Sequence, residues 1–259
     1  MYQKNKGNVW TGLKSLLRGI LTPSTHSQKE GNKMSFIVAI DGPAGSGKGT
    51  ITKLVGEKLG LVNIDTGATF RCVTLAMLQQ NISTNEEEKI KKLLENIKIE
   101  FKKENNIQMV LLNGQDVTKK IREKEVNNFV SQVSTLKIVR EKLLNLQRKI
   151  AEGKDVIMEG RDIGTTVFPN ANVKIYLDAT PEERAKRRVL QNQEKGISTS
   201  YEEALENVKS RDKMDSEREL APLKKAEDAI YVDSTNLTID EVVQKIIEII
   251  ESSKDKNKK

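Results

Sequence analysis

"GPAGSGKGT", Gly42–Thr50, follows the apolar run "FIVAI" after a single residue, and a helical pattern starts within it at Lys48. Glycines allow backbone amides to approach phosphate oxygens closely, and the N-terminus of a helix adds partial positive charge. In the pattern G-x-x-x-x-G-K the lysine reaches the β- and γ-phosphates of a nucleotide. The stretch therefore predicts a phosphate-binding loop between a buried strand and a helix.

The loop departs from the usual pattern at Gly49, where a serine or threonine is expected, and the hydroxyl comes one position later at Thr50. This predicts that Mg²⁺ is held through ATP and waters, with no firm protein ligand and Thr50 as the candidate side chain. A dinucleotide site is the main competitor, because Asp65 ends the second strand pattern. However, "GSGKGT" does not fit G-x-G-x-x-G, and that motif needs no lysine.

Composition excludes several kinds of chemistry. The only histidine of the 259 residues, His26, lies in a polar N-terminal stretch, which excludes a histidine base or a histidine-ligated metal in the core. The single cysteine, Cys72, cannot form an internal disulfide, and we expect a cytoplasmic protein. With 36% hydrophobic and 31% charged residues, and no run of 18 apolar residues, the chain is expected to be globular without a membrane span.

The net charge of +7 is concentrated near the N-terminus. Residues 1–35 hold six basic residues and one acidic residue, and the remainder holds 38 basic and 36 acidic residues. The nearly balanced remainder predicts no nucleic-acid partner. Apolar residues from Val9 to Leu21 recur at helical spacing, which is open to three interpretations: a surface helix, a targeting peptide, or a flexible extension ahead of a start at Met34.

Short apolar runs alternate with helical patterns, which indicates an α/β fold: a parallel five-stranded sheet with helices on both faces. The helices are expected at 48–59 and about 68–80, and the strands at "FIVAI", "LVNI" (61–64), "DVIME" (155–159), "NVKIYLD" (172–178) and "AIYVD" (229–233). Residues 97–121 alternate at period two and predict an inserted antiparallel meander. One domain is expected at 36–252, between the extension 1–35 and a disordered tail 253–259.

Six further motifs follow the loop along the chain: "DTGATFR" (65–71), "SQVSTLKIVREKLL" (131–144), "EGRDIGTTVFP" (159–169), "EERAKRR" (182–188), "RDKMDSERELAPL" (211–223) and "DST" (233–235). Together they resemble the cytidylate kinase family of P-loop nucleoside monophosphate kinases over residues 36–250. The loop alone is shared with other kinases of this class, whereas the combination is much narrower. Taken singly, Arg71 and Arg140 also fit ordinary surface positions.

The resemblance implies a role for each motif. Lys48 and the lid arginines would be catalytic, and the lid would span about 182–200 and the monophosphate-binding insert about 84–125. Thr66 stands where the family has serine and keeps the hydroxyl. The ATP loop would comprise Gly42, Pro43, Ala44, Gly45, Ser46, Gly47, Lys48, Gly49 and Thr50; the lid arginines are Arg184, Arg187 and Arg188; the acceptor phosphate would contact Thr66, Arg71, Arg161 and Arg218; cytosine would contact Ser131, Arg140 and Asp162; and the sugar would contact Arg211 and Asp215.

The implied reaction is ATP-dependent phosphoryl transfer to CMP and dCMP, giving CDP and dCDP, by a monomer. A monophosphate acceptor has a second pKa of about 6, so no general base is required. Catalysis then rests on in-line positioning, charge neutralisation and exclusion of water. Asp41 and Glu159 end strands near the loop and stay outside the assignment. The alternatives are a related kinase with UMP or AMP as acceptor and, less favoured, a non-catalytic protein that binds nucleotide or RNA.

Overall fold

β1 lies in the middle of a parallel sheet with the order β2-β6-β1-β7-β8. The computed structural model describes residues 35–104, 107–194 and 196–256, and all five expected strands are found there. Because β1 is buried on both faces, its sequence is a continuous apolar run rather than an alternating one. The strands are β1 (Ile37–Asp41), β2 (Val62–Asp65), β6 (Val156–Gly160), β7 (Val173–Asp178) and β8 (Ile230–Asp233).

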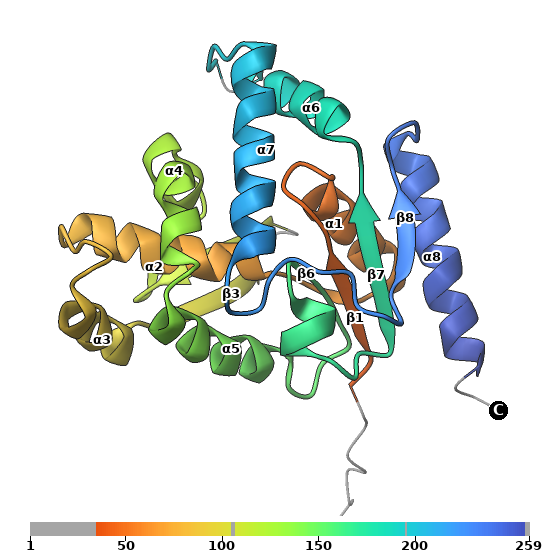
Figure 1. Ribbon diagram of the computed structural model, residues 1–259. Helices are drawn as coiled ribbons and strands as arrows, with labels where there is room; N and C mark the ends of the chain where they lie inside the picture. The colour runs from red at the N-terminus through yellow and green to blue at the C-terminus, as the bar shows by residue number, and fades with distance from the viewer. Residues whose placement is uncertain (1–34, 105–106, 195, 257–259) are drawn as a thin grey trace, which may run out of the picture. The chain divides into compact units, whose positions relative to one another are not determined.

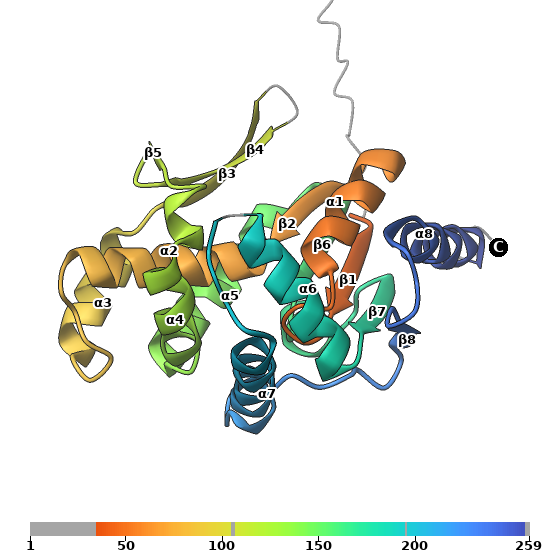
Figure 2. The same ribbon diagram turned by 90° about the horizontal axis from the view of Figure 1, so that it is seen from above.

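Helices cover both faces of this sheet, as predicted (Figures 1 and 2). On one face α1 (Lys48–Leu59) and α8 (Ile239–Lys256) pack on Val38, Ile40 and Ile175. On the other face α5 (Lys137–Ala151) and the wide turn η2 (Ile163–Val167) pack on Ala39, Ile64 and Met158. The loops at the carboxyl ends of the strands are left open for ligands, as in other sheets of this type.

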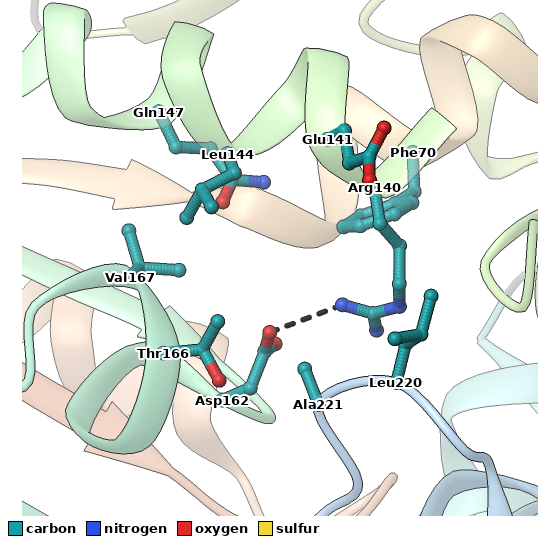
Figure 3. Close-up of a pocket in the computed structure, with 10 residues that line it drawn as sticks. All are labelled: Phe70, Arg140, Glu141, Leu144, Gln147, Asp162, Thr166, Val167, Leu220 and Ala221. Carbon is teal, nitrogen blue, oxygen red and sulfur yellow. Dashed lines mark hydrogen bonds and ion pairs between the residues drawn. The ribbon is translucent and has the colours of Figure 1, made fainter. Parts of the chain in front are cut away.

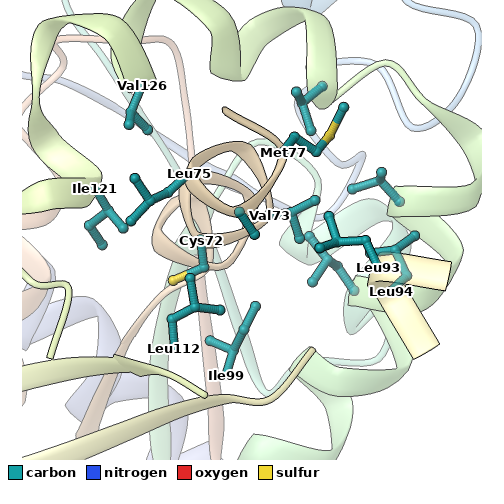
Figure 4. Close-up of a cluster of buried hydrophobic side chains, with 14 of the residues drawn as sticks. Cys72, Val73, Leu75, Met77, Leu93, Leu94, Ile99, Leu112, Ile121 and Val126 are labelled. Atoms are coloured by element: carbon teal, nitrogen blue, oxygen red, sulfur yellow. The ribbon is translucent and has the colours of Figure 1, made fainter. Parts of the chain in front are cut away.

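A second hydrophobic core surrounds α2 (Thr66–Gln79), which leaves the end of β2. Figure 4 shows Cys72, Val73 and Met77 of α2 among side chains from the surrounding elements. The helix starts two residues before the expected position because the Asp65 side chain caps it, accepting a hydrogen bond from Ala68 N at 3.0 Å. The elements around α2 are α3 (Glu87–Asn96), β3 (Ile99–Glu104), β4 (Ile107–Leu112), β5 (Gln115–Asp116), η1 (Lys120–Arg122) and α4 (Lys124–Val133).

The predicted meander is confirmed as the antiparallel sheet β3-β4-β5. Ile99 lies opposite Leu112, so that apolar side chains of both strands face the second core. Asn113 and Gly114, with φ angles of 51° and 83°, form the two-residue turn between β4 and β5. An Asn-Gly pair is favoured in such turns because both positions require positive φ.

After β7 the chain forms α6 (Pro181–Gln193) and α7 (Tyr201–Glu217), which pack on each other. α6 lies beyond the carboxyl end of β7, and α7 runs back from there toward the level of the sheet (Figure 1). Thr180 and Ser200 cap their N-termini by accepting hydrogen bonds from the amides of Glu183 and Glu203. No helix in the three described ranges is long and apolar enough to span a membrane.

The C-terminal helix corrects one expectation. α8 continues to Lys256, into the segment expected to be a disordered tail from residue 253. Ser253 Oγ donates to Ile249 O at 2.9 Å, and the Lys254 ammonium lies 4.9 Å from the centroid of the Phe36 ring. These contacts extend the helix beyond its apolar pattern. The interpretations of residues 1–34 lie outside the described residues, as do residues 257–259.

Candidate active site

The phosphate-binding loop joins β1 to α1 at the carboxyl edge of the sheet. Gly47 caps α1 with a φ of 89°, a conformation that favours glycine. Glu159 accounts for the glycine at position 49, where the usual pattern has serine or threonine, because a Cβ there would lie 3.1 Å from Glu159 Oε1. A serine or threonine at position 49 would therefore require the Glu159 carboxylate to shift by a few tenths of an ångström.

Lys48 is 5% exposed and lies over its own loop. Its Nζ donates to Pro43 O at 2.7 Å and to Ser46 Oγ at 3.2 Å. Burial lowers the pKa of Lys48, and the nearby charge of Arg161 lowers it further. A polyanion in the loop would favour the charged ammonium, so the site is suited to phosphate.

Guanidinium groups from several elements gather beside the loop. Arg161 Nε donates to Asp215 Oδ2 at 2.8 Å, and Arg218 Nη1 lies 3.6 Å from Asp215 Oδ1. Burial, then the charges of Arg161, Arg71 and Arg188 among others, lowers the pKa of Arg211 to about 10.

Several donors of this cluster are buried without an acceptor. Within the described residues these donors are Nε and Nη1 of Arg71, Nε of Arg211 and Nη2 of Arg218. Arg71 has a loose ion pair with Asp65 at 3.6 Å. Leaving a buried donor unpaired is costly, so the cluster fits an anion with several oxygens.

Thr66 lies at the N-terminus of α2 and is buried. Its Oγ1 donates to Glu159 O at 2.7 Å, and a Cβ on Gly160 would lie 2.7 Å from Thr66 Oγ1. The Thr66 side chain and the end of β6 are therefore in close contact. The free amides of a helix N-terminus add to the attraction for an anion.

A pocket of about 190 Å³ lies next to the cluster (Figure 3). Arg140 Nη1 donates to Asp162 Oδ2 at 3.0 Å across it, and Arg140 Nε donates to Ser134 O at 2.8 Å. The Arg140 guanidinium carbon is 5.3 Å from the centroid of the Phe70 ring. Apolar walls come from Leu144, Val167, Leu220 and Ala221.

The sequence indicated part of this pocket. Arg140 and Asp162 were expected together and the structure brings them together. Ser131 is buried on α4 and is not among the residues that line the pocket. Phe70 was missed, although it stands next to Arg71 in "DTGATFR" and an aromatic residue inside that polar motif was the available signal.

The arginines of α6 do not share one environment. Arg184 is buried and donates to Ala179 O, to Ala44 O of the loop, and to both carboxylate oxygens of Asp212 on α7 at 2.9 and 2.6 Å. Arg187 donates to Ser234 Oγ at 3.0 Å and to Ser234 O at 2.6 Å. The sequence motifs contained Asp212 and Ser234, but their roles could not be seen without these contacts.

Arg188 differs from its two neighbours on α6. It donates to Gln191 Oε1 at 3.2 Å. Burial lowers the pKa of Arg188, and the charge of Arg71 lowers it further. Arg184 contacts the phosphate loop and Arg187 contacts the segment after β8, whereas the Arg188 side chain is bonded within α6.

Two carboxylates left out of the sequence assignment lie within the site. Asp41 accepts hydrogen bonds from the amides of Ile163 and Gly164 at 2.8 and 2.7 Å, and burial raises its pKa to about 6. Burial also raises the pKa of Glu159, with Asp65 contributing. In the part of the chain that the structure describes, no three histidine, cysteine or acidic side chains are grouped to hold a metal.

The comparisons with known proteins agree with this geometry. A sequence model of the family described as cytidylate kinase matches residues 38–252. The chain belongs to the cytidylate kinase family. A cytidylate kinase of Caldicellulosiruptor saccharolyticus is 55% identical over 212 residues, which are 82% of this chain and 94% of that protein. One from Bacillus cereus is 50% identical over 213 residues, covering 82% and 95%. The expected family, the α/β fold and a nucleoside monophosphate kinase are confirmed.

Proposed function

We propose that this kinase transfers the γ-phosphoryl group of ATP to CMP and dCMP, giving CDP and dCDP. One observation carries the proposal: a line of charged contacts runs from the pocket through the guanidinium cluster. Asp162 in the pocket lies 3.6 Å from Arg218, which lies 3.6 Å from Asp215, and Asp215 accepts from Arg161 at 2.8 Å. Arg161 in turn influences the pKa of Lys48. A nucleoside monophosphate with its base in the pocket would direct its phosphate toward the loop.

The pocket suits cytosine. Cytosine offers an amino group to the Asp162 carboxylate, and its carbonyl and ring nitrogen accept from the Arg140 guanidinium. Uracil would place a carbonyl oxygen where the amino group lies, facing a carboxylate, and such a contact is repulsive. Ser131 is assigned to the base by the family motif alone.

The acceptor phosphate would be held by Thr66, Arg71, Arg161 and Arg218, and the sugar by Asp215 with Arg211. The unpaired donors of Arg71 and Arg218 support the first assignment. A dianion in this cluster would accept several charge-assisted hydrogen bonds at once. The phosphate is itself the nucleophile, so no residue needs to remove a proton.

The donor side would use Lys48, the loop amides and Arg188 to stabilise negative charge on the transferred group. Mg²⁺ bound with ATP would neutralise further phosphate charge. Thr50 on the first turn of α1 is exposed, and Glu159 lies beside Gly49, so a hydroxyl and a carboxylate are present for a metal held mainly by phosphates and waters.

The lid at about 182–200 and the monophosphate-binding insert at about 84–125 are part of the proposal. α6 contacts the loop through Arg184, so a movement of this helix over ATP would carry Arg187 and Arg188 with it. Closure would exclude water and prevent futile hydrolysis of ATP.

The first experiment measures ADP release from Mg-ATP by the purified chain, with CMP, dCMP, UMP, AMP and GMP offered separately. The proposal expects the highest kcat/KM with CMP and dCMP. Equal or greater turnover with UMP or AMP would still identify the chain as a nucleoside monophosphate kinase but would overturn the assignment of the pocket to cytosine. Transfer to none of these acceptors would overturn the proposed reaction.

A further inference from the structure

Asp41 connects the phosphate loop to the acceptor site. It is the last residue of β1, directly precedes Gly42, and is 5% exposed. Its two carboxylate oxygens accept from consecutive amides: Oδ1 from Ile163 N at 2.8 Å and Oδ2 from Gly164 N at 2.7 Å. A carboxylate paired with two backbone amides is a strong, directional contact.

The turn that Asp41 holds carries groups assigned to the substrate. Arg161 and Asp162 immediately precede these two amides. The turn is wide, with Val167 N bonded to Asp162 O at 3.1 Å and Phe168 N to Ile163 O at 2.7 Å. The first amides of such a turn have no partner within it, and Asp41 supplies one from another strand.

Gly164 shows how closely the turn is confined. A Cβ at this position would lie 3.2 Å from Lys174 Cδ and 3.4 Å from Asp41 Oδ2. The turn therefore lies between the Asp41 carboxylate and the Lys174 side chain, and Lys174 is itself fixed by an ion pair with Asp228 at 2.8 Å. A small shift of the turn would displace Asp162 relative to Arg140.

We propose that Asp41 is a positioning residue for the acceptor nucleotide, whose carboxylate fixes the turn at 160–167 and thereby the selection of cytosine over uracil by Asp162. This inference rests on the proposed acceptor site. Asp41 does not touch the nucleotide; it acts through the backbone of the turn. Loss of the Asp41 carboxylate would weaken the contacts with the acceptor, whereas the residues of the phosphate loop that contact ATP would remain in place.

The test is Asp41→Asn, which preserves size but replaces one acceptor oxygen by an NH₂ group that faces an amide. Calorimetry with CMP and with UMP measures affinity without requiring turnover. We expect CMP to bind roughly tenfold more weakly and the preference for CMP over UMP to fall, because a buried amide loses its partner. Amide exchange at Ile163 and Gly164 should become faster, while ATP affinity changes by less than about twofold.

Two further variants keep the test decisive. Glu241→Gln is the matched control, because Glu241 Oε2 likewise accepts from a backbone amide, Thr238 N at 2.8 Å, at the exposed start of α8 and outside the acceptor site, and it should leave both affinities unchanged. Gly164→Ala displaces the same turn without altering the carboxylate, so it should also lower the preference for CMP over UMP. It provides the test if Asp41→Asn does not fold.

Equal weakening of CMP and UMP by folded Asp41→Asn, or unchanged exchange at Ile163 and Gly164, would overturn the proposal. If the unaltered chain binds CMP but transfers no phosphoryl group, the proposed reaction fails and the affinity ratio still decides the role of Asp41. If the unaltered chain shows no preference for CMP over UMP, the proposal for Asp41 fails as well.

Discussion

Lys48 is the residue whose environment most directly predicts a catalytic effect. Its ammonium is buried in the loop, bonded to a carbonyl and a hydroxyl that a phosphate would replace. We expect Lys48→Met to lower kcat by about 10²- to 10³-fold, the usual cost of removing one donor from developing charge. Steady-state ADP release measures this. Lys53→Met, an exposed lysine of the same helix, is the control and should retain full turnover; an equal loss in both variants would contradict the role.

Asp162 carries the selectivity prediction. Its carboxylate lies in the pocket beside Arg140, and Asp162→Asn would present an amide that can donate to the uracil carbonyl. We expect kcat/KM for CMP to fall by about 10- to 100-fold and that for UMP to fall much less or to rise. The measurement is competition between CMP and UMP for limiting ATP. Asp240→Asn, at an exposed position of α8, should leave the ratio unchanged, and an unaltered ratio in Asp162→Asn would refute the base assignment.

Asp41 predicts a dependence of stability on pH. Its pKa is raised from an ordinary value of 3.8 to about 6. Burial is the main cause and the Asp162 charge adds to it, while the Gly164 and Ile163 amides and Lys48 oppose the shift. Between pH 6 and pH 4 the folded chain therefore holds a proton that the unfolded chain has lost, and this group's contribution to stability rises as pH falls. Relative to Asp41→Asn, the unaltered chain should gain up to about 3 kcal/mol in free energy of unfolding across this window. Urea unfolding at pH 7, 5.5 and 4.5 measures it, and parallel pH dependences in the two chains would contradict the pKa.

The helices α6 and α7 are joined through one ion pair with two hydrogen bonds. Arg184 is 3% exposed, so removing its partner leaves a buried charge with fewer acceptors. We expect Asp212→Asn to lower the free energy of unfolding by about 2 kcal/mol, the range for a hydrogen bond to a charged group. Urea unfolding measures it, with Lys213→Gln, the exposed neighbour on α7, as the control. A loss below about 0.5 kcal/mol, typical of an exposed substitution, would show that the pair does not hold α6 to α7.

The insert packs mainly on the hydrophobic core around α2. That core includes Ile99 and Ile121, whereas one face of the sheet packs through Val38, Ile175 and Ile246. A core that is largely distinct from this face of the sheet would allow the insert at about 84–125 to move when the acceptor binds. We expect CMP to slow amide exchange in α3 and β4 by severalfold and to leave α8 unchanged. Exchange measured with and without CMP tests this, and unchanged rates in the insert would count against the movement.

Most of the fold could be predicted from local patterns in the sequence. The five strands, α1 and the meander were all predictable because burial on both faces, helical spacing and period-two alternation are imposed on contiguous residues. The phosphate loop was predictable for the same reason, since its glycines and Lys48 act within nine consecutive residues. The extension of α8 to Lys256 was not, because it depends on contacts such as that between Lys254 and Phe36, from opposite ends of the domain.

The tertiary structure alone decided what each charged side chain contacts. "EERAKRR" contains its arginines in one turn and a half of helix, yet Arg184 bonds to Asp212 and Ala44, Arg187 to Ser234, and Arg188 to Gln191. Asp41 meets its amide partners from 122 residues away. The sequence by itself thus determined the family, the strands and the loop that binds phosphate. Which groups orient the acceptor could come only from the packed chain, because those partners are brought together by the folded sheet rather than by spacing along the sequence.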